Sequence, residues 1–134
     1  MSTSPLETVL AFVERINRHD VPGLYQLMSD DHLFVDSIGD TLKGRDEMRK
    51  AWIAYFYLFP DYAITCDHVF FKDDEVALFG TARGTYSAAG SMSQENKWEI
   101  PASWKGIVKD GLIVEWRVYA DNEPVRRILE AQKQ

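Results

Sequence analysis

The chain has 134 residues, of which 46% are hydrophobic and 27% are charged, and its formal net charge is −6. This length and composition are typical of one globular domain, so we expect a single domain over residues 1–134. The negative charge and the lack of a basic run argue against a nucleic-acid partner. No apolar stretch is long enough to span a membrane, and residues 1–10 do not resemble a secretory signal. With Cys66 as the single cysteine, these features predict a cytoplasmic protein.

Apolar residues recur at helical spacing in the first half of the chain and predict three helices. The first covers residues 5–18, where Ser4 and Glu7 have the spacing of a capping box. Asp20 caps a short second helix, and a third helix runs over residues 45–58. Between the last two, a short strand is expected.

The second half of the chain alternates apolar and polar residues, which is typical of half-buried strands. We expect strands over residues 64–71 and 76–86, followed by a long hairpin within residues 100–121. The hairpin turn is Lys109-Asp110-Gly111, because Asp-Gly accepts the positive φ angles that such a turn requires. Residues 87–96 are small and polar, and we interpret them as a flexible loop.

A short strand over residues 32–38 and a terminal helix after Pro124 complete the predicted elements. Runs of helices followed by runs of strands predict an α+β fold. We expect the helices to pack in the concave face of a curved antiparallel sheet, which would give a cone-shaped α+β barrel. Such a cone encloses a hollow that suits a small molecule.

Several short segments carry a resemblance to a known family. The chain has LMSDD at residues 27–31, Gly44-Arg45 before the third helix, FPD at residues 59–61 and KDGLIVEWRVYAD at residues 109–121. Together they resemble the SnoaL-like branch of the nuclear transport factor 2-like superfamily, over nearly the whole chain. The resemblance implies the cone fold. It is less specific for activity, because this superfamily includes isomerases, polyketide cyclases, epoxide hydrolases, dehydratases and non-catalytic binding modules.

The resemblance also implies candidate site positions. VDSIG, at residues 35–39, resembles the segment of the steroid isomerases that holds the general-base aspartate, so Asp36 matches that base. The isomerases add a tyrosine and a protonated aspartate, whose positions fall near Val13 and Ser103 here. The cyclases and limonene-type epoxide hydrolases place an acid on the last strand, where this chain has Val118. The partner groups of both classes therefore differ in this chain.

Asp36 has two interpretations, a general base facing an aromatic hollow or an exposed carboxylate at a strand end. His32 and His68 are candidates for a general acid or a ligand-binding donor, although histidine often only bridges core and surface. No third ligand accompanies His32 and Asp36 at a recognisable spacing, so we expect no metal site. Candidate ligand-binding residues, whose alternative role is core packing or a dimer face, are Trp52, Tyr55, Phe56, Trp98, Ser103, Trp104, Trp116 and Val118.

We therefore expect a protein that binds an apolar or aromatic small molecule. As an enzyme it would catalyse isomerisation, cyclisation or hydration by acid–base chemistry with Asp36 as the base. No phosphate-binding loop is present, so no cofactor is expected. The alternative is a non-catalytic binding or accessory module, which the missing partner acids favour. We also expect a homodimer formed through the outer face of the sheet.

Overall fold

The computed structural model describes residues 4–88 and 91–132 of the chain. Helices and strands follow one another in the order that the sequence predicted, with one additional short strand. In chain order they are α1 (Pro5–Asn17), α2 (Val21–Leu27), β1 (Met28–Val35), β2 (Thr41–Lys43), α3 (Arg45–Leu58), β3 (Ala63–Lys72), β4 (Glu75–Ala88), β5 (Ser91–Lys109), β6 (Leu112–Ala120) and α4 (Glu123–Ala131).

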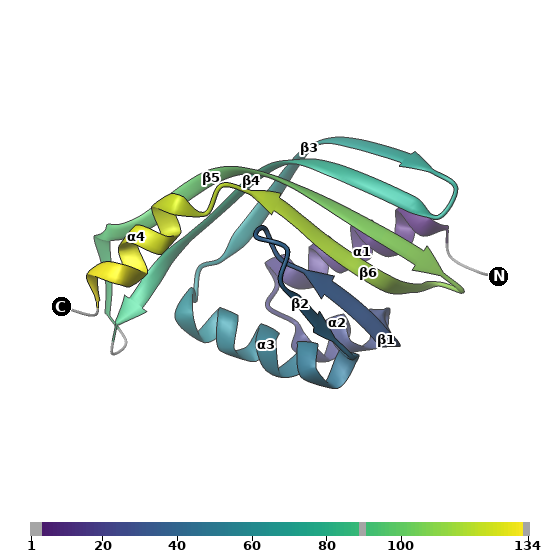
Figure 1. Ribbon diagram of the computed structural model, residues 1–134, viewed down its shortest axis with the longest axis horizontal. Coiled ribbons are helices and arrows are strands. Elements are labelled where there is room, and N and C mark those ends of the chain that lie inside the picture. Colours follow the sequence, from purple (N-terminus) through teal and green to yellow (C-terminus); the bar gives the residue numbers. More distant parts are fainter. Residues whose placement is uncertain (1–3, 89–90, 133–134) are drawn as a thin grey trace.

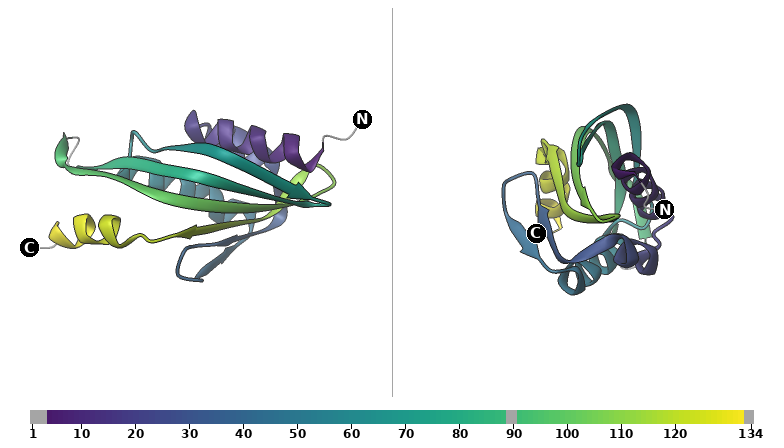
Figure 2. Two further views of the ribbon diagram at one scale, coloured as in Figure 1. Left: turned by 90° about the horizontal axis from the view of Figure 1, so that it is seen from above. Right: turned by 90° about the vertical axis from the view of Figure 1, so that its right-hand side faces the viewer.

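The strands form one curved sheet in the order β2-β1-β6-β5-β4-β3. Figure 1 shows the long strands β3 to β6 arching above α3, and the end view in Figure 2 shows the sheet curling round the helices without closing. All neighbouring strands pair antiparallel except β1 and β6, which run parallel. The fold is therefore the predicted α+β cone, built on a mixed sheet.

Local signals in the sequence specify the ends of several elements. The Ser4 hydroxyl accepts a hydrogen bond from the Glu7 amide at 3.1 Å, and the Glu7 carboxylate accepts one from the Ser4 amide at 3.4 Å. This confirms the predicted capping box. The hairpin turn is confirmed as well, because Asp110 and Gly111 have φ angles of 53° and 76°.

The interpretation of residues 87–96 as a loop is wrong. Strand β4 continues to Ala88 and β5 begins at Ser91, so this segment forms the far end of a long hairpin; residues 89–90 lie outside the described part. In sequence the segment is rich in small and polar residues. They give no apolar alternation, and the strands are held by backbone pairing instead.

A bulge changes which residues of β6 face inward. The register between β5 and β6 shifts between Ile107 and Val108. Ile113 and Trp116 are therefore both buried, although strict alternation would place them on opposite faces. From Trp116 onward the predicted alternation holds, and every second side chain faces the concave side.

The core fills the part of the cone nearest α1. Phe12 of α1 is fully buried, and its ring centroid lies 4.9 Å from that of Trp116 on β6 and 6.2 Å from that of Trp52 on α3. Gly106 lets α1 approach β5, since an added Cβ there would lie 2.8 Å from Val9 Cγ2. Among the described residues, no helix combines the length and apolar character needed to cross a membrane.

The convex face of the sheet carries exposed aromatic side chains. Phe79 and Tyr119 are 44% and 49% exposed, and strand pairing places them in one row with His68 and Ser103. Phe70, 61% exposed, packs edge-on against Phe79 with centroids 5.9 Å apart. We propose that a second copy of the chain covers this face, which gives a homodimer.

Light scattering at micromolar concentration should therefore give twice the mass of one chain. Phe79→Glu should give a monomer, because an unpaired charge inside an apolar interface is costly to desolvate. Phe71→Glu is the matched control: Phe71 is also exposed, but it pairs with the buried Val76 and so lies on the opposite face. A monomeric unmodified chain, or a dimer that survives Phe79→Glu, would contradict the proposal.

Candidate functional site

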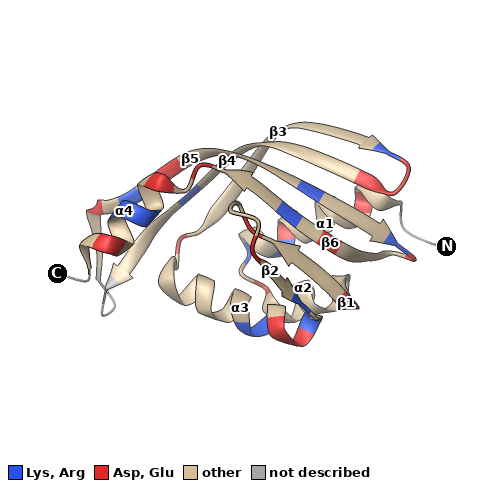
Figure 3. Cartoon of the chain, viewed as in Figure 1, with Lys and Arg blue, Asp and Glu red and all other residues tan. Residues whose placement is uncertain are grey.

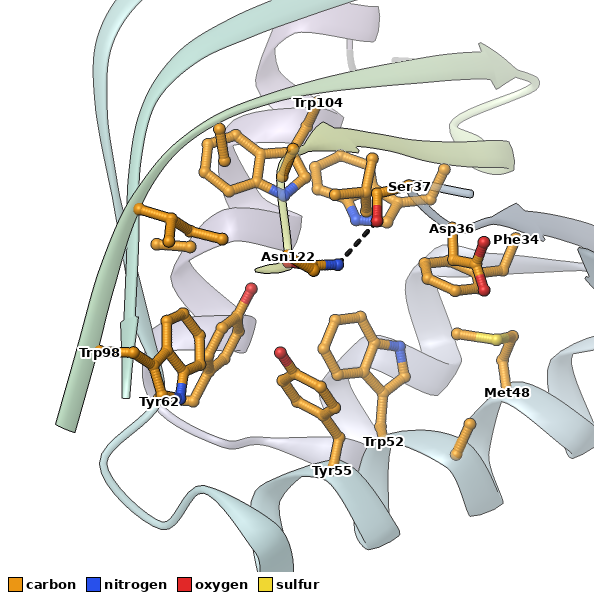
Figure 4. A pocket seen from close by; sticks show the side chains of 17 residues that line it. Phe34, Asp36, Ser37, Met48, Trp52, Tyr55, Tyr62, Trp98, Trp104 and Asn122 are labelled. Atoms are coloured by element: carbon orange, nitrogen blue, oxygen red, sulfur yellow. Dashed lines mark hydrogen bonds between the residues drawn. The ribbon is translucent and has the colours of Figure 1, made fainter. Parts of the chain in front are cut away.

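A cavity of ≈ 320 Å³ lies between α3 and the concave face of the sheet (Figure 4). This volume falls in the usual range of small-molecule sites. Its lining comes from β1 and the following loop, from α3 and the turn after it, and from β4, β5 and β6. The aromatic residues of the lining are Phe34, Trp52, Tyr55, Tyr62, Trp98, Trp104 and Trp116.

The cavity exists because small side chains face it from the sheet. Ala102 of β5 pairs with Ala120 of β6, and Ala82 of β4 faces inward on the next strand. Three inward alanines leave open the volume that larger side chains would fill. On the opposite wall, the segment of α3 from Ala51 to Leu58 carries no charged residue, as the uncoloured half of that helix in Figure 3 shows.

Edge-to-face packing fixes the aromatic walls. The Tyr55 ring stands at 90° to the Tyr62 ring, with centroids 4.8 Å apart, and at 87° to the Trp52 ring. Phe59, beneath them, packs at 87° against Trp98. Rings held in this arrangement gain attraction beyond their burial. The walls therefore have little freedom to turn.

Two phenol groups supply hydrogen-bond donors inside the cavity. Figure 4 shows the hydroxyls of Tyr55 and Tyr62 directed into it, and neither makes a hydrogen bond within the described residues. Burial raises the pKa of both hydroxyls well above the usual value, so both are protonated at neutral pH. The indole nitrogen of Trp104 also lies on the cavity side in Figure 4.

Three contacts with distant segments hold the chain around Tyr62. The Asp61 carboxylate accepts hydrogen bonds from the amide and the hydroxyl of Thr85, each at 2.7 Å. His19 Nε2 donates to the Tyr62 carbonyl at 2.7 Å, and the side-chain amide of Asn17 pairs with the start of β3. The turn that carries Tyr62 is thus tied to α1 and β4.

Asp36 lies at the rim of the cavity, directly after β1, and is half-exposed. Its Oδ1 accepts hydrogen bonds from the amides of Ile38, at 3.1 Å, and Asp40, at 2.9 Å. The turn between them needs Gly39, whose φ is 90°. Within the described chain, Oδ2 makes no hydrogen bond, so one carboxylate oxygen is tethered and the other is available.

A hydrogen bond crosses the rim beside Asp36. Asn122 Nδ2, directly before α4, donates to the Ser37 hydroxyl at 2.6 Å (Figure 4, dashed line). It joins the loop after β1 to the start of the last helix. Both residues line the cavity, so this hydrogen bond lies at the cavity entrance.

The structure brings most of the candidate site residues together. Those that line the cavity are Asp36, Trp52, Tyr55, Trp98, Trp104, Trp116 and Val118. The sequence did not single out Tyr62, Ser37 or Asn122. Tyr62 follows the FPD segment, but nothing in the local pattern shows which way its side chain points.

The other four candidates lie elsewhere. His32 is fully buried beneath the cavity, with its Nδ1 2.7 Å from the Ile113 carbonyl. Phe56 stacks on His19 with centroids 4.0 Å apart. His68 and Ser103 share a shallow groove on the convex face. In residues 4–88 and 91–132, no group of three His, Cys, Asp or Glu side chains is placed to hold a metal ion.

The sequence matches the SnoaL-like domain family over residues 9–116, which is most of the chain. The chain belongs to the SnoaL-like family. Comparison with curated proteins gave no match.

Solved structures share the fold of this SnoaL-like chain at low identity. IdmH from Streptomyces antibioticus, a proposed polyketide cyclase, is 24% identical, with 96% of this chain and 99% of IdmH covered and a TM-score of 0.78. AclR from Streptomyces galilaeus, a proposed hydroxylase, is 21% identical, with 94% and 81% covered and a TM-score of 0.75. A hypothetical protein with a ketosteroid isomerase-like fold from Catenulispora acidiphila, in complex with trimethylamine, is 19% identical, with 92% and 91% covered and a TM-score of 0.76.

The buried histidine makes stability depend on pH. His32 Nδ1 must carry the proton that it donates to the Ile113 carbonyl, which leaves Nε2 buried without a partner. Burial lowers the pKa of His32 below its usual value. The unfolded chain therefore binds a proton that the folded chain does not, from about pH 6.5 down to the lowered pKa.

In that window the free energy of unfolding should fall by up to about 1.4 kcal/mol per pH unit as the pH is lowered. Urea unfolding between pH 7.5 and 5 measures the slope. His32→Gln should remove this contribution, because glutamine does not titrate in this range. A slope that is the same in His32→Gln as in the unmodified chain would contradict the assignment.

Proposed function

We propose that this SnoaL-like protein binds an apolar small molecule with a carbonyl group and moves a proton at the carbon beside it, without a cofactor. The observation that carries the proposal is that Asp36 and the hydroxyls of Tyr55 and Tyr62 line one aromatic cavity. A base and neutral donors in one cavity are the two parts that enolisation requires.

In the proposed reaction, Asp36 Oδ2 takes the α-proton, the electron pair of the C–H bond forms a carbon–carbon double bond, and the π pair of the carbonyl moves onto its oxygen. The hydroxyls of Tyr55 and Tyr62, with the Trp104 indole N–H, stabilise the resulting enolate by hydrogen bonds. Return of the proton from Asp36 to another carbon gives isomerisation. Attack of the enolate on a second carbonyl gives cyclisation, the reaction type proposed for IdmH.

The competing proposal is a binding or accessory module without chemistry. Two observations favour it: Asp36 Oδ1 is already held by the loop amides, and the last strand has Val118 where cyclases of this superfamily would have an acid. On this alternative the cavity binds its ligand, and no proton of the ligand exchanges.

Exchange of the α-hydrogens of 2-tetralone in D2O, followed by NMR, separates the two proposals. The protein should accelerate exchange above the buffer rate, and Asp36→Asn should lower the protein-catalysed rate by about 10²-fold or more. Tyr55→Phe should lower it by a smaller factor, because Tyr62 remains.

Asp40→Asn is the matched control, since Asp40 lies in the same loop but does not line the cavity. It should retain the full rate. Binding of 2-tetralone without exchange would favour the binding module, and full exchange by Asp36→Asn would rule out Asp36 as the base.

A further inference from the structure

The cavity has an uneven set of polar groups. Among the described residues that line it, Asp36 is the one charged side chain, and no lysine, arginine or histidine is present. The remaining polar groups deeper in the cavity are the neutral donors of Tyr55, Tyr62 and Trp104. The cavity therefore offers hydrogen bonds to an acceptor and no counter-charge to an anion.

Among the described residues, no lysine or arginine of β4, β5 or β6 lines the cavity. Lys105 and Arg117 lie next to cavity residues in sequence, but they point to the convex face, where Lys105 lies 3.5 Å from Glu75 and 3.8 Å from Glu115. Arg83, on the same face of β4, donates to the Thr65 hydroxyl. An anion in the cavity would lose its hydration, gain no ion pair and lie near the Asp36 charge.

The electrostatics of the cavity favour a cation over an anion. Aromatic walls and the Asp36 carboxylate attract a positive charge. However, an ammonium group can only donate to the Tyr55 and Tyr62 hydroxyl oxygens, so the hydroxyl protons and the Trp104 N–H would find no acceptor on it. A neutral carbonyl, ester or ether oxygen satisfies these donors and leaves Asp36 in contact with water at the rim.

The volume limits the size of the ligand. At the packing density of protein interiors, ≈ 320 Å³ accommodates about 240 Å³ of molecule, which sets an upper limit of about three fused rings. The inward alanines Ala82, Ala102 and Ala120 leave room for a flat body between α3 and the sheet.

We propose that the cavity selects an uncharged molecule of up to about three fused rings that carries an acceptor oxygen, and that it rejects anions of the same shape. This inference rests on the cavity of the proposed function but does not depend on catalysis, because it concerns binding alone.

Calorimetry with ligands that share one bicyclic skeleton tests the charge preference. The probes are 2-tetralone, with a neutral carbonyl; 1,2,3,4-tetrahydro-2-naphthoate, with a carboxylate; and 2-aminotetralin, with an ammonium group at pH 7. The carboxylate should bind at least 100-fold more weakly than 2-tetralone, and the ammonium compound at least tenfold more weakly. Asp36→Asn should reduce the difference in affinity between the ketone and the carboxylate. It should increase the difference in affinity between the ketone and the ammonium compound.

The parent hydrocarbon tetralin tests the donors. Tyr55→Phe and Tyr62→Phe remove only hydroxyls that make no hydrogen bond within the described residues, so the fold should be retained. Each substitution should weaken the binding of 2-tetralone by about three- to tenfold and leave the affinity for tetralin unchanged.

The inference would be overturned if the carboxylate or the ammonium probe bound as tightly as the ketone, or if the ketone bound no more tightly than tetralin. Tighter binding of a four-ring ketone than of 2-tetralone would also overturn it, as would the absence of binding by any probe. Charge selectivity without proton exchange would contradict the proposed catalysis and support this inference. Proton exchange without charge selectivity would support the proposed catalysis and contradict this inference.

Discussion

The packing of Phe12 against the sheet and α3 is the interaction on which the site depends. Its ring is in contact with Trp116 of β6 and Trp52 of α3, and its centroid lies 6.4 Å from that of His32 on β1. One buried side chain thus joins α1 to three other elements. A buried phenylalanine of this kind typically contributes about 3–5 kcal/mol relative to alanine. Trp52 and Trp116 also line the cavity, so this cluster forms the floor of the cavity.

Above that floor, the hollow and its polar groups have separate physical origins. The volume comes from alanines on adjacent strands, while the two phenol donors come from α3 and the turn after it. The turn is held by the hydrogen bonds of Asp61 with Thr85 on β4 and by His19 after α1, and Asp36 is held by its own loop. Base and donors are therefore fixed by independent contacts. Such preorganisation is what a site needs to stabilise charge that develops during a reaction.

Much of this could be predicted from the sequence because the signals are local. The capping box of α1, the Asp-Gly turn and the alternation that directs Trp104 and Trp116 inward all lie within a few residues of the feature they specify. The resemblance added Asp36, whose position in the fold is on the cavity rim. It also suggested Ser103, although alternation with Trp104 already places that residue on the convex face.

The remaining features depend on contacts between distant segments. Tyr62 is directed by a hydrogen bond from His19, 43 residues away, and by the Asp61–Thr85 pair, which spans 24 residues. The parallel pairing of β1 with β6 and the bulge before Trp116 have no local signature. The polar end of the β4–β5 hairpin lacked alternation because neither of its faces is apolar. These are the points where tertiary structure overrides sequence pattern.

A crystal structure of the complex with 2-tetralone tests the central claim most directly, namely that Asp36 and the two tyrosines act on one ligand in this cavity. We expect the carbonyl oxygen within hydrogen-bond distance of the Tyr55 or Tyr62 hydroxyl, and the α-carbon directed toward Asp36 Oδ2. A ligand seated in the convex groove beside His68, or one whose carbonyl points to the rim and away from the tyrosines, would contradict it.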